Sequence, residues 1–321
     1  MKSVATYPIA SIGFWKCYGV HMRPYLLFVS GITGLMGTTL AHGSMNYFLF
    51  SISIIPFFFG YGFGQALTDA FQTDTDKISS PYRPLSKGYI SPGQVLKVSI
   101  SGLIFIASIL IYLSWYNIIL CTLSIIGLAT YSYVKHFWPF GPFHNSWIVM
   151  LLPIMGFLAM GGRLNLHSIL TREWIPYLIT FTSYYNFVLI GYLKDIDADR
   201  QTGYHTFPVV FGWMPTLWLG NLNIVIYLVL GYLWLDSLYS LGGFILILTA
   251  IVAFSGQIKG HFAKDHSPIS ATLPIENTVR ALVLIHIMIM IKNRPELLWF
   301  CLIFYLLFEI TLWRRPEKTQ I

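Results

Sequence analysis

Long apolar runs divide the chain from end to end, and they constrain its fold more than any other feature. A helix needs roughly 20 residues to cross a hydrocarbon core of about 30 Å. The runs show no alternation of apolar and polar residues of the kind that a closed membrane barrel requires. We therefore predict an all-α, polytopic membrane helical bundle. The runs lie at 24–41, 46–66, 94–115, 117–134, 146–161, 175–193, 214–234, 241–256, 277–291 and 296–313.

The number of spans depends on the short run at 277–291. It contains Arg280 and His286, and ionisable residues inside the hydrocarbon core are costly. This run is therefore either a half-inserted, interfacial segment or a complete span. We predict about nine transmembrane helices, or ten if this run crosses.

Composition excludes a soluble globular protein. Hydrophobic residues make up 55% of the chain and charged residues only 10%, whereas soluble proteins carry about 25% charged residues. The net charge of +7 does not indicate nucleic-acid binding, because the basic residues are spread between the apolar runs. We expect a single integral-membrane domain over 1–321, surrounded by membrane lipids.

Lys and Arg are most frequent in the N-terminal segment of about 1–23 and in the loops after the second, fourth, sixth and eighth runs. Basic residues favour the cytoplasmic side of a membrane. This bias predicts a cytoplasmic N-terminal segment and places both acidic loops, described next, on the same side.

Acidic residues are concentrated in two short segments, each directly after an apolar run. The chain has 13 Asp and Glu residues. Two segments, 69–76 and 195–199, contain Asp69, Asp74, Asp76, Asp195, Asp197 and Asp199. Solvated loops that block translocation could explain one such segment. Two on the same side, each with basic neighbours, favour a functional site.

The spacing of these acids indicates a divalent metal. If the helix continues beyond the second run, Asp69, Gln72 and Asp76 share one face, and Asp195 and Asp199 are similarly placed at i and i+4. Carboxylates aligned in this way repel one another unless a cation lies between them. Oxygen ligands suit Mg²⁺, which often shares its site with substrate phosphates.

Basic and aromatic side chains accompany the acids. Arg83, Lys194 and Arg200 are candidate phosphate ligands, although positive-inside topology alone would also place them here. Tyr131 and Lys135, at i and i+4, could hold a diphosphate or stabilise a cation. Their alternative role is an interfacial aromatic belt with a snorkelling Lys.

With these residues assembled, the chain resembles the UbiA superfamily of intramembrane prenyltransferases. The segment from Thr68 to Asp76, followed by 80–88, is similar to the family's first motif, N-D-x-x-D-x-x-x-D, and its following Y/H-R-P segment. Asp195 and Asp199 match the second motif, D-x-x-x-D. The match departs from the family at Thr68, in place of Asn, and at Gln72, in place of the middle Asp, so Asp74 is a possible substitute ligand.

The resemblance implies a helical bundle around a central cavity, with the motif loops at its cytoplasmic mouth. It implies Mg²⁺ as cofactor, held by Asp69, Asp76, Asp195 and Asp199. The diphosphate of an isoprenyl donor would bind the residues Thr68, Gln72, Arg83, Lys135, Lys194 and Arg200. Tyr131, Tyr184 or Tyr185 would face the allylic cation, and Lys135 and Tyr131 would be catalytic together with the four aspartates.

We therefore expect an Mg²⁺-dependent prenyltransferase that ionises an isoprenyl diphosphate and transfers the prenyl group to an aromatic or lipid acceptor in the membrane. The alternative is a membrane terpene cyclase of the same superfamily, in which a double bond of the donor captures the cation. A transporter is disfavoured because the acids lie at span ends, whereas transporters place ionisable residues near the bilayer midplane.

Overall fold

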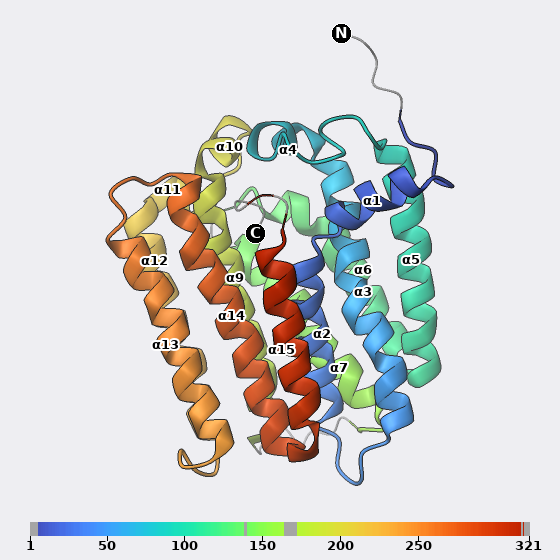
Figure 1. Ribbon diagram of the computed structural model, residues 1–321, viewed down its shortest axis with the longest axis vertical. Coiled ribbons are helices and arrows are strands. Elements are labelled where there is room, and N and C mark those ends of the chain that lie inside the picture. Colours follow the sequence, from blue (N-terminus) through green and yellow to red (C-terminus); the bar gives the residue numbers. More distant parts are fainter. Residues whose placement is uncertain (1–5, 138–139, 164–171, 316, 318–321) are drawn as a thin grey trace.

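The protein is a bundle of roughly parallel helices, described by a computed structural model for residues 6–137, 140–163, 172–315 and 317 (Figure 1). All regular elements of this described part are helical, which confirms the predicted all-α class. In chain order the elements are α1 (Ile12–His21), α2 (Pro24–Thr38), α3 (Tyr47–Phe71), α4 (Thr73–Ser79), α5 (Pro92–Leu113), α6 (Asn117–Val134), α7 (Phe140–Ala159), η1 (Arg172–Trp174), α9 (Ile175–Gly191), η2 (Tyr192–Asp195), α10 (Ile196–Gln201), α11 (Phe207–Phe211), α12 (Trp213–Trp234), α13 (Leu241–His261), α14 (Pro268–Asn293), η3 (Pro295–Leu297) and α15 (Leu298–Trp313).

Seven segments among the described residues are long and apolar enough to cross a membrane: α3, α5, α7, α12, α13, α14 and η3–α15. Shorter apolar helices lie at Pro24–Thr38 and Asn117–Tyr131. The chain is therefore an integral, multi-pass membrane protein, and the count of nine or ten spans stays a prediction. Polar residues define the helix starts: Asn46 accepts hydrogen bonds at the start of α3, and Ser91 forms a capping box with Gln94 at the start of α5.

The run at 277–291 belongs to the central helix of the bundle. It is the C-terminal part of α14, a helix of 26 residues that is almost entirely buried. A half-inserted segment is thus disfavoured, and the structure favours a complete span. His286 is enclosed by protein, with its ring nitrogens 2.7 Å from the Leu282 carbonyl oxygen and 3.0 Å from the Thr180 hydroxyl. The polar atoms of this buried ring are therefore satisfied.

Small residues allow α2 and α7 to cross at backbone contact. A Cβ added at Gly37 would lie 2.1 Å from the carbonyl oxygen of Pro153, and one at Gly156 would lie 2.2 Å from that of Gly34. Such glycine contacts are typical of membrane helix pairs, where close van der Waals packing drives association. This crossing holds α2 in the interior, where nearly all its residues are buried.

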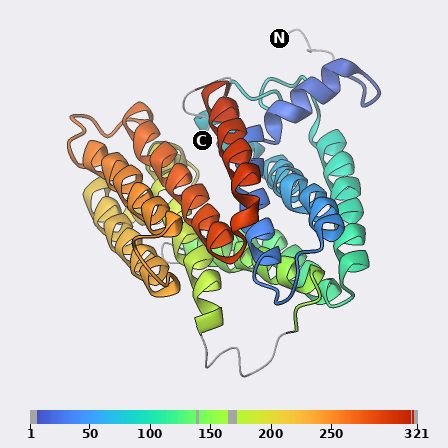
Figure 2. The ribbon, with the colours of Figure 1, turned by 60° about the horizontal axis from the view of Figure 1, so that its bottom comes forward.

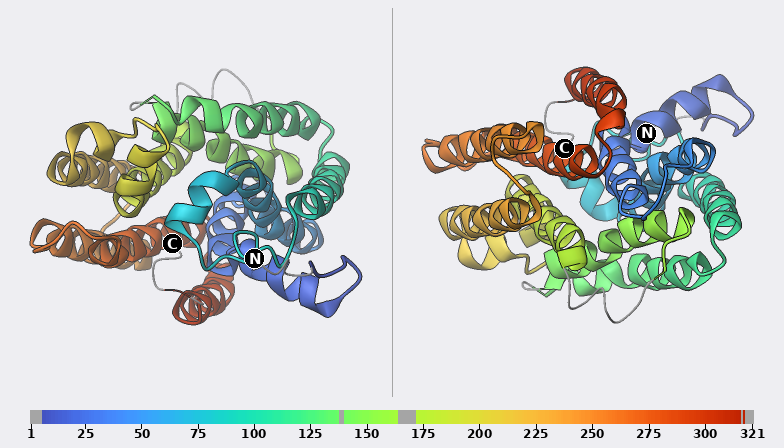
Figure 3. Two further views of the ribbon diagram at one scale, coloured as in Figure 1. Left: turned by 90° about the horizontal axis from the view of Figure 1, so that it is seen from above. Right: turned by 90° about the horizontal axis from the view of Figure 1, so that it is seen from below.

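An ionic cluster joins α14 to α15, which lies at the periphery of the bundle (Figures 2 and 3). Arg280 on α14 donates to Glu309 on α15 at 2.9 Å and to Glu276 at 3.1 Å. Glu276 also accepts a hydrogen bond from Arg315, just beyond α15. The C-terminal end of α14 contacts the loop between α2 and α3. Arg294, the residue after α14, donates to the Ala41 carbonyl oxygen at 2.8 Å.

Candidate active site at the acidic end of the bundle

Both acidic segments lie at the same end of the bundle, at α4 and α10 (top of Figure 1). The prediction that Asp69 and Asp76 share the face of one continuous helix is wrong. The helix α3 ends at Phe71, Gln72 leaves the helical conformation with φ −112° and ψ 28°, and α4 begins a new direction. Ser, Thr and Asp side chains compete for the backbone hydrogen bonds of a helix, which favours a break in this polar sequence.

Arg83 brings the two carboxylates together across the break. Its Nη1 donates to Asp76 Oδ2 at 2.6 Å and to Asp69 Oδ2 at 3.3 Å. Asp69 accepts two further hydrogen bonds, from Gln65 Nε2 at 2.6 Å and from Arg23 Nη2 at 3.0 Å. The first half of the site is thus a buried network in which two guanidinium groups face two carboxylates.

Arg23 reaches this network from a strained position between α1 and α2. Its φ of 53° is the only positive φ of a non-glycine residue in the part of the chain that the structure describes. Such a conformation costs of order 1–3 kcal/mol and persists where the surroundings impose it. The ion pair with Asp69, and Pro24 at the first position of α2, are the surroundings here.

The second acidic segment is also broken. Asp195 ends the 3₁₀ turn η2 and occupies the N-cap position of α10 without a side-chain capping bond, so it does not share a regular helix with Asp199. Asp199 is fully buried, and its two oxygens accept hydrogen bonds from Lys135 Nζ at 2.9 Å and from Thr206 Oγ1 at 3.1 Å. Lys135 Nζ also lies 5.3 Å from the centroid of the Tyr192 ring, a cation–π contact.

The two halves face one pocket of about 130 Å³. It is lined by Arg23, Leu26, Tyr61, Gln65, Thr68, Asp69, Gln72, Asp76, Arg83, Tyr131, Lys135, Asn145, Tyr184, Phe187, Val188, Gly191, Tyr192, Lys194, Asp195 and Asp199. Four carboxylates and four cationic side chains therefore meet in one pocket. Of the predicted site residues, Arg200 is not part of this lining: its side chain is mostly exposed and pairs with Asp197 at 3.6 Å. Tyr185 is likewise absent from the lining, and the Asp74 side chain lies outside the described residues.

Burial changes the proton affinities at the pocket mouth. Burial, with the neighbouring charge of Asp69, raises the pKa of Asp76 to about 6 even though Arg83 opposes this change. Burial lowers the pKa of Lys194 to about 8, against the attraction of Asp195. The pKa of Asp199 is also raised by burial, with Lys135 acting in the opposite direction. Each charged group here thus depends on its partners to stay charged.

Several lining residues were not predicted as site residues, and some of them left a signal in the sequence. Tyr61, Gln65 and Asp69 are spaced four apart on α3, which places them on one helix face. Arg23 directly precedes an apolar run. Asn145 lies in the second turn of α7 and carries no comparable pattern.

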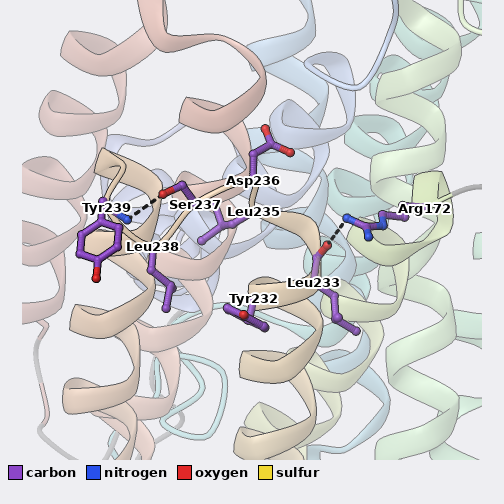
Figure 4. A pocket seen from close by; sticks show the side chains of 8 residues that line it. All are labelled: Arg172, Tyr232, Leu233, Leu235, Asp236, Ser237, Leu238 and Tyr239. Atoms are coloured by element: carbon purple, nitrogen blue, oxygen red, sulfur yellow. Dashed lines mark hydrogen bonds between the residues drawn. The ribbon is translucent and has the colours of Figure 1, made fainter.

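A second pocket, of about 350 Å³, lies at the C-terminal end of α12 and in the residues that follow it (Figure 4). It is lined by Arg172, Tyr232, Leu233, Leu235, Asp236, Ser237, Leu238 and Tyr239, and Arg172 donates to the Leu233 carbonyl oxygen at 3.3 Å. None of the predicted site residues lines it. The pocket at the acidic end therefore remains the candidate active site.

The smaller pocket fits a hard cation in its donor chemistry. Its four carboxylates offer only oxygen, which Mg²⁺ prefers. Among the described residues no three His, Cys, Asp or Glu side chains converge into a metal-binding group. Arg83, Arg23 and Lys135 instead pair with Asp76, Asp69 and Asp199. A membrane-spanning bundle that brings four carboxylates and four cationic side chains to one pocket has the chemistry to hold a divalent cation together with a phosphate-bearing substrate.

The chain belongs to the UbiA prenyltransferase family: the sequence model of that family matches residues 29–273. It is therefore a prenyltransferase, and the family predicted from the two motifs is confirmed. A digeranylgeranylglyceryl phosphate synthase of Thermococcus sibiricus is 27% identical over 262 residues, which cover 80% of this chain and 89% of that protein. The chloroplastic chlorophyll synthase of Arabidopsis thaliana is 27% identical over 64% of this chain and 54% of its own length.

Solved structures share the fold. The structure of a UbiA homolog from Archaeoglobus fulgidus bound to DMAPP and Mg²⁺ has a TM-score of 0.62 at 15% identity, covering 83% of this chain and 98% of that one. A second structure, from a study of digeranylgeranylglyceryl phosphate synthase in membranes, has a TM-score of 0.60 at 17% identity and covers 88% of this chain and 99% of that one. The bundle described above is therefore a UbiA-type fold.

Proposed function

We propose that this protein is an Mg²⁺-dependent enzyme that transfers the prenyl group of an isoprenyl diphosphate to an aromatic or lipid acceptor within the membrane. The observation that carries the proposal is the gathering of four carboxylates and four cationic side chains in one pocket. The DMAPP and Mg²⁺ held by the Archaeoglobus fulgidus homolog support it. The motif loops, on the positive-inside argument, face the cytoplasm, and residues 1–321 act as one unit.

In this proposal Asp69, Asp76, Asp195 and Asp199 hold Mg²⁺, which when bound offsets the negative charge of the diphosphate. Arg23, Arg83, Lys135 and Lys194 line the same pocket and would bind the phosphate oxygens once Mg²⁺ takes over their carboxylate partners. As the C–O bond of the donor breaks, these fixed donors stabilise the charge that accumulates on the leaving diphosphate.

The aromatic and apolar residues of the pocket wall face the prenyl fragment that remains when the diphosphate leaves. Breaking the C–O bond leaves an allylic cation, and the rings of Tyr61, Tyr131 and Tyr184 line the pocket where their faces can stabilise it. Leu26 and Phe187 limit the access of water, which would otherwise capture the cation. The acceptor then donates its electron pair to the cation and releases a proton.

The test compares three neighbouring aspartates in purified protein supplied with geranyl diphosphate, Mg²⁺ and a panel of phenolic and lipid-alcohol acceptors. Asp195→Asn and Asp199→Asn should lower prenyl transfer by about 100-fold or more, a loss typical of removing a group that stabilises transition-state charge. Asp197→Asn is the matched control, because its side chain is exposed and lies outside the pocket.

Chelation of Mg²⁺ should stop turnover in the wild type. Near-normal transfer by Asp195→Asn and Asp199→Asn would contradict the metal assignment. If the protein forms a cyclic hydrocarbon or a terpene alcohol without any acceptor, it is a terpene cyclase and the transferase proposal is wrong.

A further inference from the structure

Thr206 precedes the short helix α11, at a position where a threonine side chain usually caps the helix, but here the side chain does not do so. It occupies the N-cap position of α11, with φ −66° and ψ 160°, yet its side chain makes no capping hydrogen bond. Threonine at this position usually accepts a hydrogen bond from the first turn, and that bond stabilises the start of the helix. Here the hydroxyl is buried and donates to Asp199 Oδ2 at 3.1 Å. Local stability is given up for a contact with a site residue, which is typical of functional positions.

The hydrogen bond from Thr206 to Asp199 matters because of the other hydrogen bond that Asp199 accepts, from Lys135. Lys135 Nζ binds Oδ1 at 2.9 Å, so each oxygen of the carboxylate has its own donor. The terminal torsion of Asp is broad and roughly two-fold, and a single donor would leave the carboxylate plane free to turn. Two donors on different oxygens fix that plane with Asp199 on the wall of the pocket.

Lys135 cannot move easily to compensate. Its ammonium lies 4.6 Å from the centroid of the Tyr204 ring, and that ring stacks on His136 at 4.2 Å with an interplanar angle of 9°. The backbone N–H of Tyr204 donates to the Asp199 carbonyl oxygen at 2.8 Å. Without the Thr206 hydroxyl, the carboxylate of Asp199 is free to turn both oxygens toward this fixed ammonium.

We propose that Thr206 is a positioning residue that keeps the Asp199 carboxylate oriented for Mg²⁺ and prevents it from pairing fully with Lys135. This inference rests on the proposed function, in which Asp199 holds Mg²⁺. It assigns a role to a hydroxyl outside the pocket lining that touches neither substrate nor metal. Removing a partner of this kind typically costs 10–100-fold in metal affinity.

The test measures the binding of geranyl S-thiolodiphosphate, an unreactive donor analogue, by calorimetry over a range of Mg²⁺ concentrations. Thr206→Val keeps the shape and removes the hydroxyl, whereas Thr206→Ser keeps the hydroxyl. Thr202→Val is the control, because that hydroxyl lies one turn away and donates only to backbone carbonyls, the nearer being Ala198 at 2.8 Å. We expect Thr206→Val to need about 10-fold more Mg²⁺ for half-maximal analogue binding, with Thr206→Ser and Thr202→Val within about twofold of the wild type.

An unchanged Mg²⁺ requirement in Thr206→Val, or an equal defect in Thr206→Ser, would overturn the positioning role while leaving the proposed function intact. Analogue binding by the wild type that does not depend on Mg²⁺ would overturn both proposals. If Thr206→Val does not fold, Thr206→Ala removes the same hydroxyl without a branched side chain and is read by the same criteria.

Discussion

Neutralising the two aspartates of the first acidic segment should change stability in opposite directions. Asp69 accepts hydrogen bonds from Arg23, Arg83 and Gln65, so Asp69→Asn leaves buried guanidinium groups without their counter-charge. Removing one partner of a buried ion pair costs about 3–5 kcal/mol. We expect Asp69→Asn to destabilise the metal-free protein by an amount in this range.

Asp76→Asn should instead stabilise the metal-free protein. The pKa of Asp76 is raised from 3.8 to about 6, chiefly by burial, which corresponds to about 3 kcal/mol once the carboxyl is ionised. Because the folded pKa is the higher one, this carboxyl favours folding most below about pH 4, and that contribution is lost as the pH rises through about 6. A neutral amide avoids this cost but also gives up the charge of the 2.6 Å contact with Arg83, so the gain at pH 8 is smaller than about 3 kcal/mol.

The assay is thermal unfolding in detergent with a chelator present, at pH 8 and pH 5, with Asp197→Asn as an exposed control. At pH 8 the melting temperature should fall for Asp69→Asn and rise for Asp76→Asn. At pH 5 the advantage of Asp76→Asn should shrink, because the wild-type carboxyl is then largely protonated. Shifts of the same sign for both variants, or an advantage that does not depend on pH, would refute this reasoning.

Three further predictions concern the bundle and the pH profile. Gly37→Ala should destabilise the protein by about 2 kcal/mol, because the new Cβ would overlap the backbone of Pro153. Gly60→Ala, whose new Cβ would have one neighbouring atom, at 3.7 Å, should be neutral or stabilising. Equal melting temperatures for the two variants would contradict the predicted clash. Glu309→Gln should lower stability by about 1 kcal/mol, measured by thermal unfolding, because Arg280 loses a charge-assisted partner; an unchanged melting temperature would show that the ionic cluster does not fasten α15. The Mg²⁺ concentration needed for half-maximal prenyl transfer should rise as the pH falls through about 6, where Asp76 of the metal-free protein becomes protonated and protons compete with the metal; a requirement that is the same at pH 8 and pH 5 would rule this out.

From the sequence it was possible to predict that the four aspartates lie at one end of the bundle, but not how their side chains are oriented. Asp69, Asp76, Asp195 and Asp199 could be grouped because each follows an apolar run on the same side of the membrane, and span order alone brings such positions to one end of a bundle. Their orientation could not be predicted, because breaks at Gln72 and Asp195 replaced the continuous helices that the spacing suggested.

The partners of these acids depend on tertiary contacts that no local pattern records. Arg23 is 46 residues from Asp69, and Lys135 is 64 residues from Asp199. Arg200 shows the opposite failure: proximity in sequence to Asp199 suggested a site residue, but helical geometry directs its side chain away to Asp197 at the surface.

The central position of α14 sets the order in which the protein can be completed during synthesis. Pocket residues extend only from Arg23 to Asp199, so all of them leave the ribosome before α14 does. Yet α14 packs against α2, α9 and η2, and Arg294 binds a carbonyl oxygen 253 residues earlier. Contacts so distant in sequence form late. A chain that ends before α14 would therefore contain every pocket residue but lack the helix that packs against α2, α9 and η2.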